Sequence, residues 1–349
     1  MLSDKKPLVS VIVLNWNGKK FLKNCLSSLL QQTYKNYEIV FMDNGSIDDS
    51  VDFVKTRFKG CSKIRIVALG RNYGFSKGNN IGFKHAKGKY VISLNNDTEV
   101  QPNFVEELVK VAESDEKIGS VGCKIVNYDG SAGYGPVFTN KGFIVPFLFA
   151  SDIKLVRRRW EKICSMYSAN LANCGCAVLY GKKVLEIVGG FDEDFWSDWE
   201  DHDLGFRISL AGFKSVYTPK TAVFHAGAGS ESFSTKRSVR IVRNMLFTYI
   251  KNYEPENVAT RFMLFLFILL PITHIARIFL NEWRIFRKRA SLSLKLLVGR
   301  RRGYFALFKA YASFLHMLPF FILKRKKVQR LRKVSDRVIF SRTKMSCLL

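Results

Sequence analysis

The sequence predicts an α/β protein with a mostly parallel central sheet and helices on both of its faces. Short apolar segments rich in β-branched residues alternate with segments that carry apolar residues at helical spacing. The short segments are apolar without alternation, as in strands that are buried on both faces. Each ends in a cluster of polar residues. Because ligands of such sheets bind beyond the carboxyl ends of the strands, we expect these clusters to form one site.

The elements follow one another in a regular order along the chain. Strands are expected at residues 9–14, 37–42, 64–69, 90–94, 173–180 and 219–223. Asp48 or Asp49 can cap the helix after the second strand. The polar segment 71–80 is expected to be a loop, followed by a short helix at 81–85, and Pro102 opens the next helix.

Charge divides the chain into two parts. The net charge is +27, and 26 of the 56 Lys and Arg residues lie after position 235, together with only four of the 29 Asp and Glu residues. We therefore expect a folded domain over residues 1–235 and a basic, helical, membrane-associating tail over 236–349. Within the domain, the irregular segment 127–165 is interpreted as a loop insertion over the site.

The tail carries two long apolar runs, at 262–280 and 304–323, flanked by Lys and Arg. Apolar runs beside cations suit an anionic membrane surface, whereas a nucleic-acid-binding arm needs no such runs; no nucleic-acid partner is expected. Pro271 and Arg277 lie within the first run, and the segment 281–302, expected to be a loop, is strongly basic. Interfacial or re-entrant helices are therefore favoured over spanning ones.

Cysteine usage and the N-terminus favour the cytoplasmic side of the membrane. The seven cysteines are odd in number and scattered, as in proteins of a reducing compartment. Cys174 and Cys176 are too closely spaced for a zinc knuckle. The charged N-terminal residues lack the apolar core of a secretory signal.

The turns after the first two strands favour a nucleotide but disfavour NAD. A dinucleotide fold needs a glycine-rich turn after its first strand, whereas here the turn contains Trp16 and a single glycine, Gly18. Asp43, at the end of the second strand, can accept hydrogen bonds from a base or a ribose hydroxyl. It can equally cap a tight turn.

Two further segments offer metal ligands. Asn95, Asn96 and Asp97 end the fourth strand in oxygen acceptors of the kind that Mg²⁺ or Mn²⁺ binds, although the same residues are common in simple turns. His225, after a later strand, is either a core histidine or a further metal ligand.

An acidic cluster lies between two tryptophans. Asp203 and Arg207 are four residues apart and can pair on a helix, but no partner is evident for Asp201. Crowding of like charges raises a carboxylate pKa toward the range of a general base, so Asp201 is the candidate base. Trp196 and Trp199 either stack on a sugar ring or belong to the core.

Taken together, these motifs resemble the family 2 glycosyltransferases of the GT-A fold, in particular the rhamnosyltransferase-like branch of surface polysaccharide synthesis. The resemblance covers residues 9–230. The matching motifs occur in the family's order at residues 9–17, 43–48, 72–80, 94–98, 189–193 and 199–204.

The resemblance implies inverting, single-displacement transfer of a hexose from a UDP- or dTDP-linked sugar to a lipid-linked or oligosaccharide acceptor, with Mg²⁺ or Mn²⁺ as cofactor. Residues 1–126 would bind the nucleotide sugar and residues 127–235 would form the acceptor and catalytic half. The donor-side residues would be Asn15, Trp16, Asn17, Asp43, Asn44, Asn72, Gly74, Lys77, Gly78, Asn79, Asn95 and Asn96. The acceptor-side residues would be Trp196, Trp199, Glu200, Asp203 and Arg207. Asp97 and His225 would bind the metal, and Asp201 would be the base.

One departure from the family pattern concerns the metal motif. It usually begins with Asp, where this chain has Asn95, which keeps an oxygen acceptor but loses a charge. The alternative function is therefore a catalytically weakened nucleotide-sugar-binding or scaffold protein of the same fold.

Overall fold

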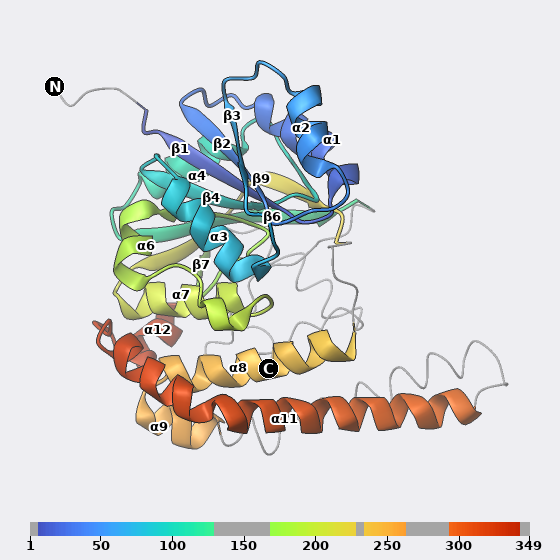
Figure 1. The fold of residues 1–349 in the computed structure, drawn as a ribbon. Coiled ribbons are helices and arrows are strands. Elements are labelled where there is room, and N and C mark those ends of the chain that lie inside the picture. Colours follow the sequence, from blue (N-terminus) through green and yellow to red (C-terminus); the bar gives the residue numbers. More distant parts are fainter. Residues whose placement is uncertain (1–5, 129–167, 228–233, 263–292, 343–349) are drawn as a thin grey trace.

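The computed structural model describes residues 6–128, 168–227, 234–262 and 293–342 of the chain. Within these ranges, nine strands form one sheet in the order β3-β2-β1-β4-β8-β6-β9-β5, with β7 paired to β9 (Figure 1). Their bounds are β1 Val9–Asn15, β2 Tyr37–Asp43, β3 Ile64–Ala68, β4 Tyr90–Asn95, β5 Thr98–Val100, β6 Ile118–Asn127, β7 Ser168–Asn170, β8 Ala177–Gly181 and β9 Lys214–His225.

The predicted α/β class and mostly parallel sheet are confirmed. Strands β3, β2, β1 and β4 run parallel to one another. β8 runs antiparallel to both β4 and β6, and β6 is parallel to β9. The parallel half therefore brings the ends of β1, β2 and β4 to one edge, where the first polar clusters lie.

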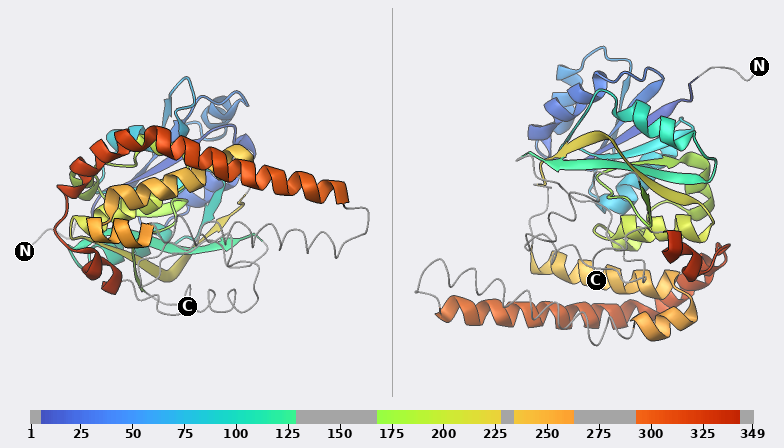
Figure 2. Two further views of the ribbon diagram at one scale, coloured as in Figure 1. Left: turned by 90° about the horizontal axis from the view of Figure 1, so that it is seen from below. Right: turned by 180° about the vertical axis from the view of Figure 1, so that it is seen from behind.

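Helices cover both faces of this sheet (Figures 1 and 2). Their bounds are α1 Lys19–Leu30, α2 Ser50–Arg57, α3 Gly74–His85, α4 Phe104–Ala112, α6 Lys182–Val188, the 3₁₀ turn η2 Glu193–Phe195 and α7 Glu200–Leu210. Val11 and Val13 of β1 share a core with α1 and α4, whereas Ile12 shares one with α3, α6 and α7. Burial on both faces is the physical reason for the unbroken apolar strands.

The C-terminal helices pack onto this α/β unit. Their bounds are α8 Thr235–Asn252, α9 Pro255–Asn257, the π-helical turn Val258–Phe262, α11 Ser293–Gln329 and α12 Asp336–Arg342. α8 lies between α7 and the long α11 (Figures 1 and 2). One apolar cluster joins Phe206 of α7, Phe247 of α8 and Phe321 of α11. Among the described residues, no helix combines the length and apolar character that crossing a bilayer requires.

Several expected boundaries in the α/β unit were wrong. The strand expected at 219–223 is part of β9, which begins at Lys214, and the helix expected to open at Pro102 begins at Phe104. The segment 71–80 is not all loop, because α3 begins at Gly74, where φ is +77° and the backbone N–H donates to the side chain of Asn72. The strand expected at 173–180 begins only at Ala177. Asn173 instead donates its side-chain amide to the carbonyl oxygen of Val216, which holds the preceding segment beside the sheet.

The tail also differs from expectation. The basic segment expected to be a loop up to residue 302 is helical from Ser293 onward. The apolar run 304–323 is not wholly available to a membrane, because Phe314 and Phe321 are buried in the cluster with α8. The insertion expected at 127–165 and the run at 262–280 fall almost entirely outside the described residues.

Candidate active site

Polar side chains from the ends of three strands meet at one edge of the sheet. Asn15, at the end of β1, donates from Nδ2 to Oδ1 of Asp43 at the end of β2, at 3.1 Å. Asn96, just after β4, donates from Nδ2 to Oδ1 of Asn15 at 2.6 Å. A Cβ at Gly18 would lie 1.9 Å from the Asn96 amide nitrogen, so a larger residue there would displace the Asn96 side chain from this contact. The expected convergence of these clusters is confirmed.

The turn after β2 is ordered by the same carboxylate. Oδ2 of Asp43 accepts from the backbone N–H of Ser46 at 3.0 Å, so Asp43 does cap this turn. Ser46 in turn accepts from the backbone N–H of Asn17, and the Asn17 side chain accepts from Ile47. Trp16, which is half-buried, lies between Asn15 and Asn17 in the sequence. Because each carboxylate oxygen can accept a second hydrogen bond, capping leaves Asp43 able to receive a nucleoside.

The start of α3 is tied to the turn after β2 by asparagines. Asn44 donates to Oδ1 of Asn72 at 3.0 Å and accepts from the backbone N–H of Tyr73. Asn72 then accepts from Gly74, which begins the helix. These contacts bring Asn44, Asn72 and Gly74 to the same edge as Asp43, as expected.

The remaining donor-side residues on α3 differ in exposure. Asn79 is fully buried, where it accepts from the Ser93 hydroxyl, and a Cβ at Gly78 would clash with Leu14. Both positions therefore serve helix-to-strand packing in this structure. Lys77 is 45% exposed, with Nζ 3.5 Å from Glu193, so its ammonium group remains accessible to a ligand.

Asp97 and His225 form a buried pair at the same edge. Pairing of β5 with β9 sets His225 beside the turn, and its Nε2 lies 3.2 Å from Oδ1 of Asp97. Within the described residues, Oδ2 of Asp97 and Nδ1 of His225 lack hydrogen-bond partners. Burial disfavours the charged imidazole, but the hydrogen bond and charge of Asp97 outweigh it and raise the pKa of His225. Buried polar side-chain atoms in proteins mostly have a hydrogen-bond partner, so the two unpaired atoms of Asp97 and His225 need an explanation.

This pair has the donor chemistry for a divalent cation. A carboxylate suits Mg²⁺ or Mn²⁺ and a neutral imidazole is a common metal ligand, and the vacant acceptor on Asp97 is available as a ligand atom. Where the structure is described, no group of three or more His, Cys, Asp or Glu side chains is arranged to hold a metal ion. The rest of a coordination shell would therefore have to come from other groups, such as diphosphate oxygens or water. Asn95, half-buried next to this pair, completes the predicted motif.

The loop before α7 has a strained backbone. Trp196, Asp198 and Trp199 have backbone φ angles of +65°, +64° and +77°, which residues other than glycine rarely adopt. Trp196 is 44% exposed and its ring covers the position where Gly74 would carry a Cβ. The Trp199 ring stacks on the His202 ring at 4.3 Å. Trp196 therefore remains open to a ligand beside the sheet edge where β1, β2 and β4 end, which we call the donor edge because most residues predicted to bind the donor lie there. One face of the Trp199 ring is occupied by His202.

The expectation that Asp201 lacks a partner was wrong. Its Oδ2 accepts from the backbone N–H of Gly175 at 2.8 Å, and its Oδ1 lies 2.5 Å from Nδ1 of His202. Burial alone would raise the pKa of Asp201, but the charge of His202 and these hydrogen bonds lower it. The raised pKa expected from crowding belongs instead to Glu200, because it is buried beside Asp201 and Asp198. The environment thus favours the ionised form of Asp201 and the neutral form of Glu200.

The predicted pair of Asp203 and Arg207 is confirmed and is part of a larger buried network. Nε of Arg207 donates to Oδ2 of Asp203 at 2.9 Å, and both side chains are buried. Arg207 also donates to the carbonyl oxygens of Val188 and Gly190, which fixes the turn at 189–193. These two residues therefore hold the backbone of a turn in the half that is predicted to bind the acceptor.

The helix α8 contributes to this network, which the sequence did not lead us to expect. Lys251, only 1% exposed, lies 2.9 Å from Asp203 and also pairs with Asp192. Arg240 and Asn244, on the same helix, contact the loop before α7. The spacing of the polar residues at 237, 240, 244 and 251 follows one helical face and would have revealed a polar stripe within the basic tail.

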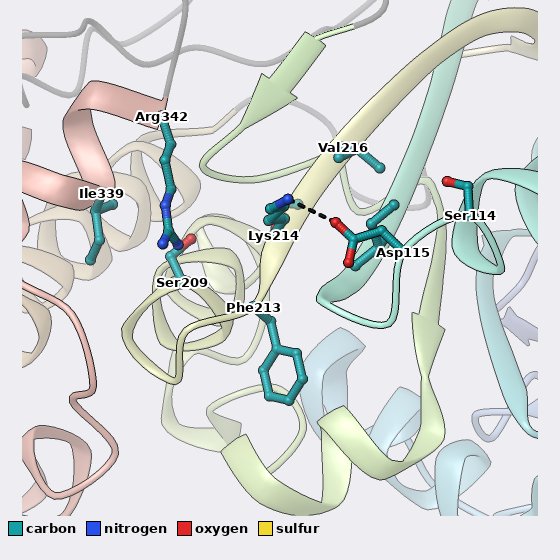
Figure 3. A pocket seen from close by; sticks show the side chains of 10 residues that line it. Ser114, Asp115, Ser209, Phe213, Lys214, Val216, Ile339 and Arg342 are labelled. Carbon is teal, nitrogen blue, oxygen red and sulfur yellow. Dashed lines mark hydrogen bonds and ion pairs between the residues drawn. The ribbon is translucent and has the colours of Figure 1, made fainter.

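Two cavities lie in very different positions. One of about 650 Å³ borders the donor edge and is lined by Asn17, Lys19, Lys20, Lys23, Asp48 and Phe53. Another of about 270 Å³ lies at the opposite end of β9, around Lys214 and its ion-pair partner Asp115 (Figure 3). None of the predicted site residues lines the second cavity.

Known proteins share both the sequence and the fold of this chain. The family model described as Glycosyl transferase family 2 matches residues 10–186. O-antigen biosynthesis protein RfbC of Myxococcus xanthus is 28% identical over 236 residues, which cover 64% of this chain and 18% of that protein. Glycosyltransferase GlyG of Streptococcus pneumoniae is 33% identical over 129 residues, 36% of this chain and 42% of that protein. The chain thus spans less than half the length of these relatives.

Solved structures extend the likeness to nearly the whole chain. Mannosyltransferase PcManGT from Pyrobaculum calidifontis, in complex with GDP-Man and Mn²⁺, has a TM-score of 0.55 at 16% identity and covers 94% of this chain and 88% of its own. S. aureus TarS in complex with UDP-GlcNAc has a TM-score of 0.53 at 15% identity and covers 92% and 90%. At these identities the likeness shows the fold, which is GT-A-like. Because the family model matches half of its residues, the chain belongs to glycosyltransferase family 2.

Proposed function

We propose that this protein is an inverting glycosyltransferase that moves a hexose from a UDP- or dTDP-linked donor to a lipid-linked or oligosaccharide acceptor in cell-surface glycan synthesis. The observation that carries the proposal is the buried pair of Asp97 and His225, with its vacant ligand atoms, at the edge where β1, β2 and β4 end. The name of the relative RfbC, an O-antigen biosynthesis protein, supports the glycan role.

The donor would lie along this edge. Asp43 would accept a hydrogen bond from the nucleoside, and the adjacent cavity at Asn17 offers space beside it. Lys77, whose ammonium is half exposed, would neutralise part of the diphosphate charge. Asp97 and His225 would hold Mg²⁺ or Mn²⁺, which neutralises negative charge on a departing diphosphate.

Asp201 would remove the proton from the acceptor hydroxyl. The acceptor oxygen forms its bond to the anomeric carbon while the bond to the diphosphate breaks, and the hydroxyl proton moves to the Asp201 carboxylate. A single in-line displacement of this kind inverts the anomeric centre. The opposite directions of the pKa shifts support Asp201 over Glu200, because a lowered pKa favours the ionised carboxylate, the form that can accept a proton, although it also makes Asp201 a weaker base than crowding predicted.

The reaction would take place at the cytoplasmic surface of the cell membrane. Cys25, Cys61, Cys123, Cys174 and Cys176 are free thiols in the structure, as is usual in a reducing compartment. The basic tail would contact anionic lipids, which would place the site near a lipid-linked acceptor.

The test is to measure release of nucleoside diphosphate from a panel of UDP-, dTDP- and GDP-sugars with Mn²⁺, Mg²⁺ or a chelator. We expect metal-dependent turnover with a UDP- or dTDP-sugar. Donor binding by calorimetry without turnover of any sugar, even with added lipid-linked acceptors, would instead favour the catalytically weakened binding protein.

A further inference from the structure

The helix α11 has apolar side chains on two opposite faces, and among the described residues only one of these faces packs against another helix. On the inner face, Ala310, Phe314 and Phe321 are buried, and the Phe314 ring lies 5.0 Å from the Phe247 ring of α8. A helix that is apolar all round is normally enclosed on all sides. The outer face of α11 therefore needs its own explanation.

The outer face forms a continuous apolar stripe. Phe308, Leu315 and Ile322 follow one another at seven-residue intervals and are 69%, 63% and 45% exposed. Leu323, on the same side, is 63% exposed. Because seven residues make two helical turns, these side chains lie on one line along the helix. Among described residues, α11 and α9 lie farthest from the sheet, and α8 lies between α11 and the α/β unit (Figures 1 and 2).

Cations border this stripe. Lys309 is exposed near its start, and Lys326, Lys327 and Arg330 are exposed where the apolar residues end. The sequence of α11 contains no Asp or Glu. A stripe of apolar side chains at the depth of acyl chains, with cations at the depth of the headgroups, is the pattern of a helix that lies in the interface of an anionic bilayer.

We propose that the outer face of α11, from Phe308 to Arg330, is the surface that binds an anionic lipid bilayer. The proposal rests on the proposed function in that both place the enzyme at a membrane, but it does not depend on the transfer reaction. It assigns the lipid contact to one face of the helix that contains the run 304–323, because the opposite face packs against α8. The lack of acidic residues on α11 favours lipid over a second copy of this basic chain, because two like-charged surfaces would repel.

The experiment is co-sedimentation of the full chain with vesicles of phosphatidylcholine alone or mixed with phosphatidylglycerol. We expect the wild type to bind the mixed vesicles more tightly, with binding that weakens in salt. Leu315→Glu with Leu323→Glu should reduce binding at least tenfold, because two charges would enter the acyl region. The matched control is Ile187→Glu, which places the same charge at a 50% exposed position on α6.

The cationic border is tested separately. Lys326→Gln with Lys327→Gln should weaken binding to the mixed vesicles by about fivefold per lysine, the worth of about 1 kcal/mol for each cation near an anionic surface. Binding to neutral vesicles should not change. Lys183→Gln, on the exposed side of α6, is the matched control.

Folding and oligomeric state are followed in the same variants by thermal denaturation and light scattering. Wild-type protein that binds neither vesicle, or a double Leu→Glu variant that folds and binds as tightly as Ile187→Glu, would overturn the proposal. It would also be overturned if the wild type were a dimer that the Leu→Glu changes convert to a monomer. A wild-type protein that binds the vesicles but turns over no donor would refute the proposed function and would still support the lipid-binding surface.

Discussion

The Arg240 guanidinium lies against the Asp198 carboxylate, with Nε 3.0 Å and Nη2 2.5 Å from Oδ2. Arg237, one turn earlier on α8, donates to Oδ1 of the same carboxylate at 2.8 Å. Asn244 donates to the backbone carbonyl of Asp198 at 2.7 Å. These contacts hold a loop whose φ angles cost energy, and the loop leads directly into Glu200 and Asp201. The C-terminal helices therefore hold the loop that leads into α7, which carries the residue proposed as the base.

We expect Asp198→Ala to destabilise the protein by about 3 kcal/mol, because it removes the carboxylate that pairs with two partly buried guanidinium groups. Transfer should fall more than donor affinity, since the loop carries acceptor-side residues. Denaturant unfolding, donor calorimetry and turnover measure the three effects. Lys236→Gln, at an exposed position of the same helix, should change none of them. Equal losses of donor affinity and turnover would show that the contact does not act on the acceptor side.

Asp97→Ala should weaken metal-dependent donor binding and transfer together. It removes the carboxylate whose Oδ2 is vacant and leaves His225 without its hydrogen bond. Titration of Mn²⁺ in the presence of donor measures the change directly. Asp115→Ala, at the opposite end of β9 beside the small cavity, provides a control that should retain both properties. A variant at Asp97 with unchanged Mn²⁺ dependence would exclude this residue as a metal ligand.

Asp201→Asn should lower turnover by roughly two to four orders of magnitude while donor affinity changes little, because Asn keeps the shape of Asp but cannot accept the proton. Glu200→Gln should lower turnover by less than about tenfold, since burial raises the pKa of Glu200 and so favours the neutral acid, which Gln resembles. Single-turnover kinetics with saturating donor measure the rate of transfer for each of the two variants. Normal turnover of Asp201→Asn beside an inactive Glu200→Gln would transfer the role of base to Glu200.

Stability should depend on pH through Asp192. Burial alone would raise the pKa of this carboxyl, but Lys251 and Lys324 outweigh it and hold the pKa far below its usual range. The unfolded chain then binds the proton at higher pH than the folded protein does. The stabilisation is therefore present above about pH 4 and is lost as the pH falls toward the lower folded value.

Asp192→Asn should accordingly lower the melting temperature at pH 7 and make it less sensitive to acid between about pH 5 and pH 3. Thermal unfolding across this range measures both effects. Asp52→Asn removes a carboxylate whose pairing with Lys55 is exposed, and it should leave the profile unchanged. If the Asp192→Asn profile runs parallel to that of the wild type, the ion pairs with Lys251 and Lys324 do not contribute to acid sensitivity.

The sequence by itself determined the parallel half of the fold and the donor edge. The strands expected at 9–14, 37–42 and 90–94 each differ from the structure by one residue at the carboxyl end. Strand period, apolar burial and polar strand ends are local properties, and parallel neighbours in register bring Asn15 beside Asp43 without further information.

Only the tertiary structure decided the surroundings of the acidic cluster and the use of the tail. Asp201 meets Gly175, which lies 26 residues earlier, and Asp192 meets Lys324, which lies 132 residues later. Whether an apolar residue of α11 faces α8 or the outside is likewise set by how two distant helices dock. Partners of this kind are selected by packing across the whole fold, so neither the pKa of Asp201 nor the division of α11 into two faces can be derived from spacing along the chain.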